Sequence, residues 1–215
     1  MAQPSNSDVD HFIARWQAAG GSERANYQLF VHELCTLLDL PTPDPAREDT
    51  RDNAYVFERR VTFRHGDGAE SPGFIDCYRR AAYVLEAKKV RQAGGKGFDD
   101  ALLRARGQAE QYARALPAAE GRPPFLLVVD VGNVIELYAE FTRSGATYTP
   151  YPDPRSHRIQ LADLRDEVGR WAPQTGRQFT LDEREEMVQY LNESHYRFGL
   201  PPKSRWPNSD PSPTR

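Results

Sequence analysis

The sequence predicts an α/β fold built on a mixed sheet whose first half is antiparallel. A helical pattern precedes three consecutive strand patterns, and a second helical pattern is followed by two more strands. No G-x-G-x-x-G follows a predicted strand, and strands and helices do not alternate as in a dinucleotide-binding fold. The segment AGGKG at 93–97 lacks the spacing of a phosphate-binding loop. We therefore read it as a connection and expect no nucleotide site.

The N-terminal part of the chain predicts two helices and a loop. Phe12, Ile13 and Trp16 recur at helical spacing within 8–18, and a Gly-Gly pair ends that pattern. Ser22 is suited to cap a longer helix. The apolar residues of this second helix share one face: Tyr27, Phe30, Val31, Leu34, Leu37 and Leu38. A loop rich in Pro and Asp follows.

The centre of the chain predicts three strands in succession. Period-two alternation in 54–64 predicts that one side of the first strand carries Tyr55, Phe57, Arg59, Val61 and Phe63. Residues 65–73 predict a turn. The segments 74–78 and 81–88 then predict two strands joined by a tight hairpin at Arg79-Arg80.

The second half predicts a helix followed by a strand pair. The helix is expected over 98–116, the apolar run at 123–132 predicts a buried strand, and 133–141 predicts its hairpin partner. A loop rich in Tyr and Pro comes next. Two amphipathic helices are expected near 161–170 and 180–194. The Pro/Ser-rich tail from about residue 200 is expected to be disordered.

The composition indicates a soluble globular protein. The 215 residues are 39% hydrophobic and 27% charged, no run reaches the roughly 18–20 apolar residues of a membrane helix, and no signal peptide is expected. The two cysteines support neither a disulfide framework nor a zinc site, which favours a cytoplasmic setting. The net charge of −3 argues weakly against a dedicated nucleic-acid coat protein. Between Arg59 and Arg106, however, basic residues outnumber acidic ones.

Charged residues stand in the predicted hairpin where apolar ones are usual. Asp76 would share a face with Phe74 and Tyr78, and Glu86 and Lys88 would share a face of the next strand. Across the hairpin the two carboxylates would converge and repel, which a hard divalent cation would relieve. The backbone carbonyl of Ala87 is a candidate third ligand for Mg²⁺. Lys88 would orient or deprotonate an attacking water.

Less specific interpretations stand beside this one. The three residues of D-x9-E-A-K could form a structural salt-bridge cluster at a strand end, and the bare pattern is weak. The nearby bases are suited to clamp phosphates but could equally be a solvated face; they are Arg79, Arg80, Lys89 and Arg91.

The hairpin with its D-x9-E-x-K pattern resembles the PD-(D/E)xK nuclease superfamily, whose αβββαβ order matches about 22–132. Gln108 and Tyr112 on the following helix resemble the Q-x-x-x-Y motif of RecB-like members. A longer resemblance, over about 11–165, is to the N-terminal nuclease region of MmeI-like (type IIL) restriction–methylation enzymes. It is carried by FIARWQAAGGSERANYQLFVHELCTLLDLPTPDP, YVFERRV, IDCYRRAAYVLEAKK and PPFLLVVDVGNVIELYAEF.

The resemblance implies a restriction-endonuclease-like core with added C-terminal helices. Together with the periodicity and composition of the chain, it predicts the following division: an N-terminal helix and arm at 1–21, a nuclease-like domain at 22–160, a helical extension at 161–199 and a disordered tail at 200–215. It also implies Asp76 and Glu86 as ligands of Mg²⁺ or Mn²⁺, with catalytic roles for Lys88 and Gln108. Tyr112 would contact DNA.

The resemblance also suggests an additional acid on the helix before the sheet. Glu23 falls where some superfamily members carry an extra metal-linked acid. Glu33 is a rival for that role, and both could be ordinary acids of the helix surface.

The expected function is that of a metal-dependent DNA endonuclease in restriction or related anti-phage defence. No F-x-G-x-G or N-P-P-[YF] methyltransferase signature is present. The chain would therefore be a fragment of a larger enzyme, or would depend on a methyltransferase/target-recognition subunit or another defence protein. A homodimer would supply the second site that double-strand cleavage needs, and no membrane is involved. Alternatives are a non-catalytic nucleic-acid- or partner-binding module, and a nuclease for RNA or single strands.

Overall fold

The structure is a computed structural model that describes residues 4–90 and 96–166. By its internal contacts the chain divides into residues 1–172 and 173–215. Arg91, the predicted helix near 180–194 and the predicted tail lie outside the described residues. The division into four segments stays a prediction. No described helix combines the length and the apolar character needed to cross a membrane.

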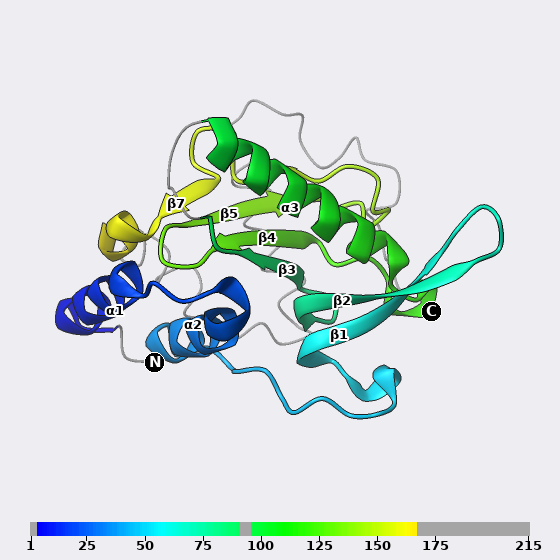
Figure 1. Cartoon of the computed structure of the whole chain (residues 1–215), viewed down its shortest axis with the longest axis horizontal. Helices are drawn as coiled ribbons and strands as arrows, with labels where there is room; N and C mark the ends of the chain where they lie inside the picture. The colour runs from blue at the N-terminus through cyan, green and yellow to red at the C-terminus, as the bar shows by residue number, and fades with distance from the viewer. Residues whose placement is uncertain (1–3, 91–95, 167–215) are drawn as a thin grey trace, which may run out of the picture. The chain divides into compact units, whose positions relative to one another are not determined.

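A mixed seven-stranded sheet forms the centre of the described part of the chain (Figure 1). Its strands are β1 (Tyr55–Arg64), β2 (Glu70–Arg79), β3 (Tyr83–Lys88), β4 (Phe125–Asp130), β5 (Val134–Ala139), β6 (Thr149–Pro150) and β7 (Arg158–Gln160). They follow the order β1-β2-β3-β4-β5-β6, with β7 on β5. The pair β3–β4 is parallel and the other described pairs are antiparallel. This confirms the predicted mixed α/β fold.

Helices cover both faces of the sheet (Figure 1). On one face lie α1 (Asn6–Ala18) and α2 (Glu23–Leu37), and on the other lies α3 (Lys96–Ala115), which connects β3 to β4. A parallel pair requires such a crossover. Ser22 occupies the N-cap position of α2, but the side-chain capping bond expected of it is not formed. All three helices begin and end within a few residues of the bounds predicted from the sequence.

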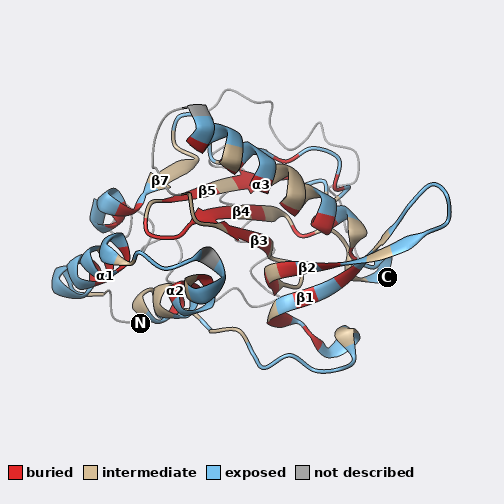
Figure 2. Cartoon of the chain, viewed as in Figure 1, coloured by how far each residue is buried: buried red, intermediate tan, exposed pale blue. Residues whose placement is uncertain are grey.

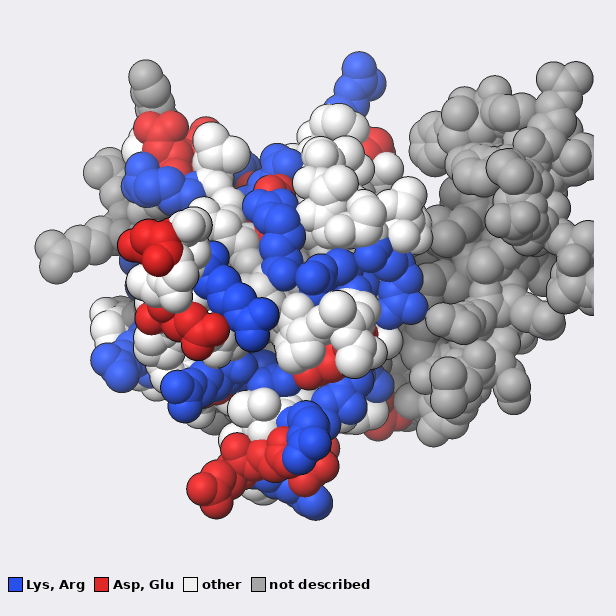
Figure 3. Space-filling model, turned by 90° about the vertical axis from the view of Figure 1, so that its right-hand side faces the viewer, with Lys and Arg blue, Asp and Glu red and all other residues white. Residues whose placement is uncertain are grey.

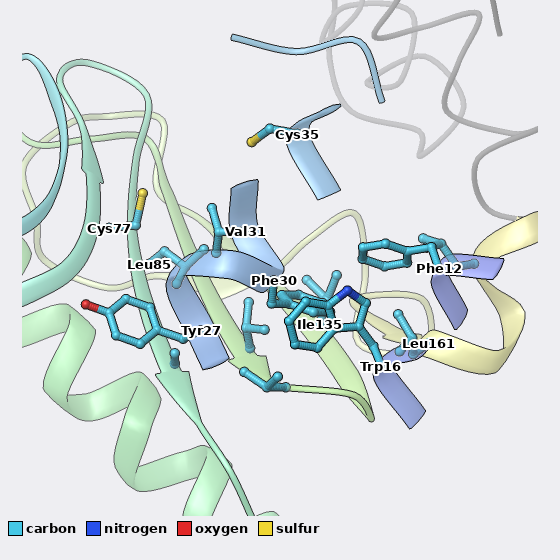
Figure 4. Close-up of a cluster of buried hydrophobic side chains, with 14 of the residues drawn as sticks. Phe12, Trp16, Tyr27, Phe30, Val31, Cys35, Cys77, Leu85, Ile135 and Leu161 are labelled. Atoms are coloured by element: carbon cyan, nitrogen blue, oxygen red, sulfur yellow. The ribbon is translucent and has the colours of Figure 1, made fainter. Parts of the chain in front are cut away.

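Each face of the sheet has its own hydrophobic core. Toward α1 and α2, Trp16 meets Phe30 edge-on with ring centroids 5.1 Å apart, and Leu85 of β3 packs into the same cluster (Figure 4). Toward α3, Leu102 packs with Val84 of β3. Neighbouring residues of β3 thus point to opposite cores, as the alternation of a strand requires.

The single face predicted for the first strand is wrong beyond Phe57. Tyr55 and Phe57 belong to the core of α1 and α2, whereas Val61 and Phe63 belong to the core of α3. The change occurs at Glu58, whose φ of 52° is left-handed. One such residue interrupts the two-residue alternation, so the remainder of the strand presents its side chains to the other face.

Three other segments differ from prediction. The turn expected at 65–73 is shorter, because β2 already begins at Glu70 and extends an exposed hairpin (Figure 2). The loop expected at 147–155 contains β6, and β7 follows it. A 3-10 turn at Leu161–Asp163 opens the helix expected at 161–170, and only residues 164–166 of the helix itself are described.

Candidate functional site

Strands β2 and β3 separate at the level of the predicted carboxylates. Cys77 and Leu85 form the last ladder pair on this side of the hairpin, and Asp76 and Glu86 are the next residues on the two strands. Asp76 Oδ2 accepts a hydrogen bond of 2.7 Å from the backbone N–H of Ala87. A carboxylate therefore takes the place of the next ladder carbonyl. We call the region of Asp76, Glu86 and Ala87 the β2–β3 fork.

Lys88 lies against Glu86 at the fork. Its Nζ is 2.6 Å from Glu86 Oε1, and the two side chains are 27% and 2% exposed. A carboxylate this deeply buried requires a compensating charge or hydrogen bond, and the ammonium supplies both. The structure thus pairs Lys88 with Glu86 and places Asp76 on the backbone of Ala87 between them. Their roles as metal ligands and catalytic lysine stay predictions.

The predicted face shared by Phe74, Asp76 and Tyr78 is not maintained along β2. Phe74 is exposed, whereas Tyr78 is fully buried in the core of α3. Ile75 lies in that same core, and Cys77 lies in the core of α1 and α2. The side-chain alternation of β2 is therefore disturbed at Asp76.

The oxygen atoms around the fork suit a hard cation. In a strand, the N–H and C=O of one residue point to the same edge, so the Ala87 carbonyl is directed to the β2 side, as its N–H is. Two carboxylates and a carbonyl suit Mg²⁺, which keeps several waters. Within residues 4–90 and 96–166, no group of three or more His, Cys, Asp and Glu side chains could hold a metal ion. An ion at the fork would therefore depend on the carbonyl and on water as well.

Glu33 and Glu23, the two acids of α2 considered for a metal-linked role, differ in what the structure shows of them. Glu33 accepts a hydrogen bond of 2.9 Å from Trp16 Nε1 and pairs with Arg15 at 3.1 Å, so it links α2 to α1. Glu23 is the first residue of α2, and its side chain lies outside what the structure describes. Its metal-linked role stays a prediction.

Helix α3 presents Gln108 and Tyr112 beside the fork. Gln108 Nε2 donates to the Tyr112 hydroxyl at 3.0 Å, as their four-residue spacing allows. Burial raises the pKa of Tyr112, and the negative charges of Glu86 and Asp76 raise it further. The Tyr112 ring also packs close to β2, because a Cβ at Gly73 would lie 2.8 Å from Tyr112 Cε1.

The basic residues predicted to contact DNA make interactions within the fold. The Arg79 guanidinium lies 5.1 Å from the ring centroid of Tyr55, and Arg80 is 3.5 Å from the Glu120 carboxylate. Lys89 Nζ donates to the carbonyl oxygen of Val131 at 2.6 Å. DNA contacts by Arg79, Arg80 and Lys89 stay predictions, and Arg91 lies outside the described residues.

Two residues near the fork were missed by the sequence reasoning. The β1–β2 ladder pairs the neighbours of Glu58 with the neighbours of Asp76, so Glu58 lies at the level of Asp76. The Tyr27 hydroxyl of α2 donates to the Glu58 carboxylate. Burial raises the pKa of Tyr27, and the charges of Glu58 and Asp76 add to the effect. The available signal for Glu58 was an acid directly after the apolar run Tyr55–Phe57.

Comparison with known proteins identifies the family of the chain. The model of a family described as MmeI, N-terminal domain, matches residues 5–189, which include the fork and α3. No curated protein and no solved structure matches the chain. The family match spans well over half of the 215 residues. The chain therefore belongs to the family of MmeI N-terminal domains, a module related to type IIL restriction enzymes.

Proposed function

We propose that the chain is a metal-dependent DNA endonuclease of the restriction type. The observation that carries the proposal is the β2–β3 fork, where the strands separate after Cys77 and Leu85, Asp76 accepts from the Ala87 N–H, and Lys88 pairs with Glu86. Membership of the MmeI N-terminal domain family supports the same reading. Anti-phage defence is the corresponding biological setting.

The residues of the fork have distinct roles in this proposal. Asp76, Glu86 and the carbonyl of Ala87 would hold Mg²⁺ or Mn²⁺, which polarises a phosphate and stabilises the leaving oxygen. Lys88 would turn its partly exposed ammonium toward the attacking water and offset charge on the phosphate. Gln108 donates to the Tyr112 hydroxyl, and the pair would position the substrate strand.

Positive charge would bring DNA to the protein. Lys and Arg side chains cross the middle of the face that carries the β1–β2 hairpin, and many Asp and Glu side chains lie toward its margins (Figure 3). Phosphate contacts release counterions, so binding should weaken steeply as salt rises. The predicted contacts of Arg79, Arg80 and Lys89 would require these side chains to exchange internal partners for phosphate.

A non-catalytic DNA- or partner-binding module is the second candidate. The ion pair between Lys88 and Glu86 at 2.6 Å is also what a purely structural salt bridge would form. Such a module would bind DNA equally well with and without Mg²⁺. A metal-dependent nuclease, by contrast, would lose its cleavage activity when the metal is removed.

Partners follow from the same proposal. Cleavage of both strands needs two active sites, which a homodimer or another chain would supply. Sequence recognition would come from a methyltransferase/target-recognition subunit or another defence protein.

Nicking of supercoiled plasmid at low salt tests the proposal. The wild-type chain should produce open circles with Mg²⁺ or Mn²⁺, and EDTA or Lys88→Ala should abolish nicking. Arg51→Ala is a matched control, because it removes one positive charge at an exposed pair with Asp49. A wild type that binds plasmid but never nicks it with either metal would favour the binding module.

A further inference from the structure

A groove beside the fork runs along α3. Its volume is about 400 Å³, within the ~300–1,000 Å³ typical of ligand sites. We call it the α3 groove, and it is lined by Phe63, Arg104, Gly107, Gln108, Gln111 and Tyr112. Gln108 and Tyr112 connect the groove to the fork. The other four residues have no role in the chemistry proposed above.

Gly107 is not explained by packing. It lies inside the 20-residue helix α3, where glycine disfavours the helix relative to alanine. A Cβ atom added at Gly107 would meet no atom within 4 Å, so no neighbouring element requires the missing side chain. A remaining physical role for glycine is to let a ligand approach the helix backbone closely.

Polar groups along the groove are available to a ligand. Arg104 and Gln111 are exposed, and neither makes a hydrogen bond or ion pair with another residue in the described part of the chain. With Gln108 they are spaced four and three residues apart, which places them along one side of α3 over about 10 Å. A guanidinium is suited to phosphate, and amides are suited to the edges of bases.

An aromatic wall borders the groove. The rings of Phe63 and Tyr112 are stacked, with centroids 5.6 Å apart and planes inclined by 25°. Gly73 of β2 permits this arrangement, because a Cβ there would lie 2.5 Å from Phe63 Cε2 and 2.8 Å from Tyr112 Cε1. The Phe63 ring is only half-buried and offers a flat apolar surface of the kind on which bases stack.

We propose that the α3 groove binds an unstacked nucleotide of the DNA strand next to the scissile phosphate. The inference rests on the proposed function for its substrate. The base would stack on Phe63 and meet the amide of Gln111, while Arg104 would pair with the adjoining phosphate. Gly107 would leave room for the strand on the helix. A fully paired duplex keeps its bases stacked, so the groove would favour single-stranded or frayed DNA.

Fluorescence anisotropy of the whole chain with a short labelled single strand, in EDTA at low salt, tests the groove. Gly107→Leu should raise the midpoint of thermal unfolding by about 2–4 °C and weaken binding roughly tenfold. Arg104→Ala should weaken binding. It should also reduce the slope of the logarithm of the binding constant against the logarithm of the salt concentration by about 1. Arg51→Ala should change binding little. A blunt duplex should bind more weakly than the single strand.

Two outcomes would overturn the groove: unchanged single-strand binding by both Gly107→Leu and Arg104→Ala, or duplex binding as tight as that of the single strand. Because binding is measured in EDTA, where a metal-dependent nuclease cannot cleave, this test of the groove is independent of the test of nuclease activity. A wild type that binds through the groove but never cleaves with Mg²⁺ or Mn²⁺ would support the groove and contradict the nuclease. Unimpaired single-strand binding and cleavage by both Gly107→Leu and Arg104→Ala would support the nuclease and overturn the groove.

Discussion

Glu86 shows how a strand in this protein accommodates a buried carboxylate. The side chain is 2% exposed and lies 2.6 Å from the Lys88 ammonium, which reaches solvent in part. Desolvation of both charges offsets much of their attraction, so such a pair contributes little net stability. Removing one partner lowers the free energy of unfolding far more than replacing both with apolar residues, because it leaves a buried charge without its counter-charge. The pair is therefore better explained by chemistry than by stability.

A stability test at the residue scale follows. Lys88→Met leaves the Glu86 charge buried with its ion pair removed, and should lower the free energy of unfolding by about 1–3 kcal/mol. The double variant with Glu86→Leu should recover most of that loss. Denaturant unfolding measures both. A double variant as unstable as the single one would contradict this account of the pair.

Glu140 gives a pH-dependent prediction. Burial of this carboxyl raises its pKa, but hydrogen bonds from Thr142, the Gly145 N–H and Ser144 outweigh burial and lower the pKa below the ordinary 4.5. The carboxylate therefore stabilises the fold above pH 4.5, and this contribution is lost as the pH falls through the folded-state pKa.

Glu140→Gln should accordingly lower the free energy of unfolding by about 1 kcal/mol at pH 7. The difference from wild type should shrink as the pH falls below 4.5. Urea unfolding at several pH values measures it, and a difference that grows on acidification would contradict the assigned sign.

At the level of single residues, the D-x9-E-A-K pattern pointed to the main candidates only together with its predicted hairpin context and the family resemblance. The tight hairpin predicted at Arg79-Arg80 is wrong, because Arg79 still belongs to β2 and pairs with Tyr83, which leaves 80–82 as the connection. The observed register makes Asp76 and Glu86 the next residues beyond the Cys77–Leu85 pair. The structural role of Glu33 could not be predicted from sequence, because its contacts with Arg15 and Trp16 depend on how α1 packs against α2. Glu58 was missed because its proximity to Tyr27 also arises from tertiary packing.

Strand β1 carries the main departure from prediction at the scale of elements. Its residues alternate regularly in sequence, but the left-handed backbone at Glu58 moves the second half of the strand to the other core. Neither glycine nor asparagine marks the position, so a local pattern could not reveal it. The short strands β6 and β7 were missed because only pairing with β5 makes them strands.

The left-handed residue can be tested directly. Glu58→Ala and Glu58→Gly both remove the carboxylate that accepts from Tyr27, but only glycine adopts a φ of 52° without strain. Glu58→Gly should therefore be more stable than Glu58→Ala by about 1 kcal/mol. Thermal or urea unfolding of the two variants gives the difference. An alanine variant at least as stable as the glycine variant would argue against the left-handed conformation.

The arrangement of the whole described unit explains why the site forms where it does. The β2–β3 hairpin separates after Cys77 and Leu85, and the crossover helix α3 returns Gln108 and Tyr112 to the same level. Periodicity and element order predicted the mixed sheet with its antiparallel first half, and the structure adds the parallel pairing of β3 with β4 across the helix. The α3 groove was beyond sequence reasoning, since Phe63 and α3 meet only in the folded sheet.

Cleavage of a labelled DNA by Glu86→Gln and Glu70→Gln, each with Mn²⁺, tests the central claim most directly. Both variants convert an acid to its amide, but Glu70 begins β2 in the β1–β2 hairpin, where it forms an exposed pair with Arg64 at 3.1 Å, away from the fork. Wild type and Glu70→Gln should cleave at similar rates, and Glu86→Gln should lose at least about a hundredfold. Equal cleavage by Glu86→Gln would contradict the assignment of the β2–β3 fork as the catalytic site.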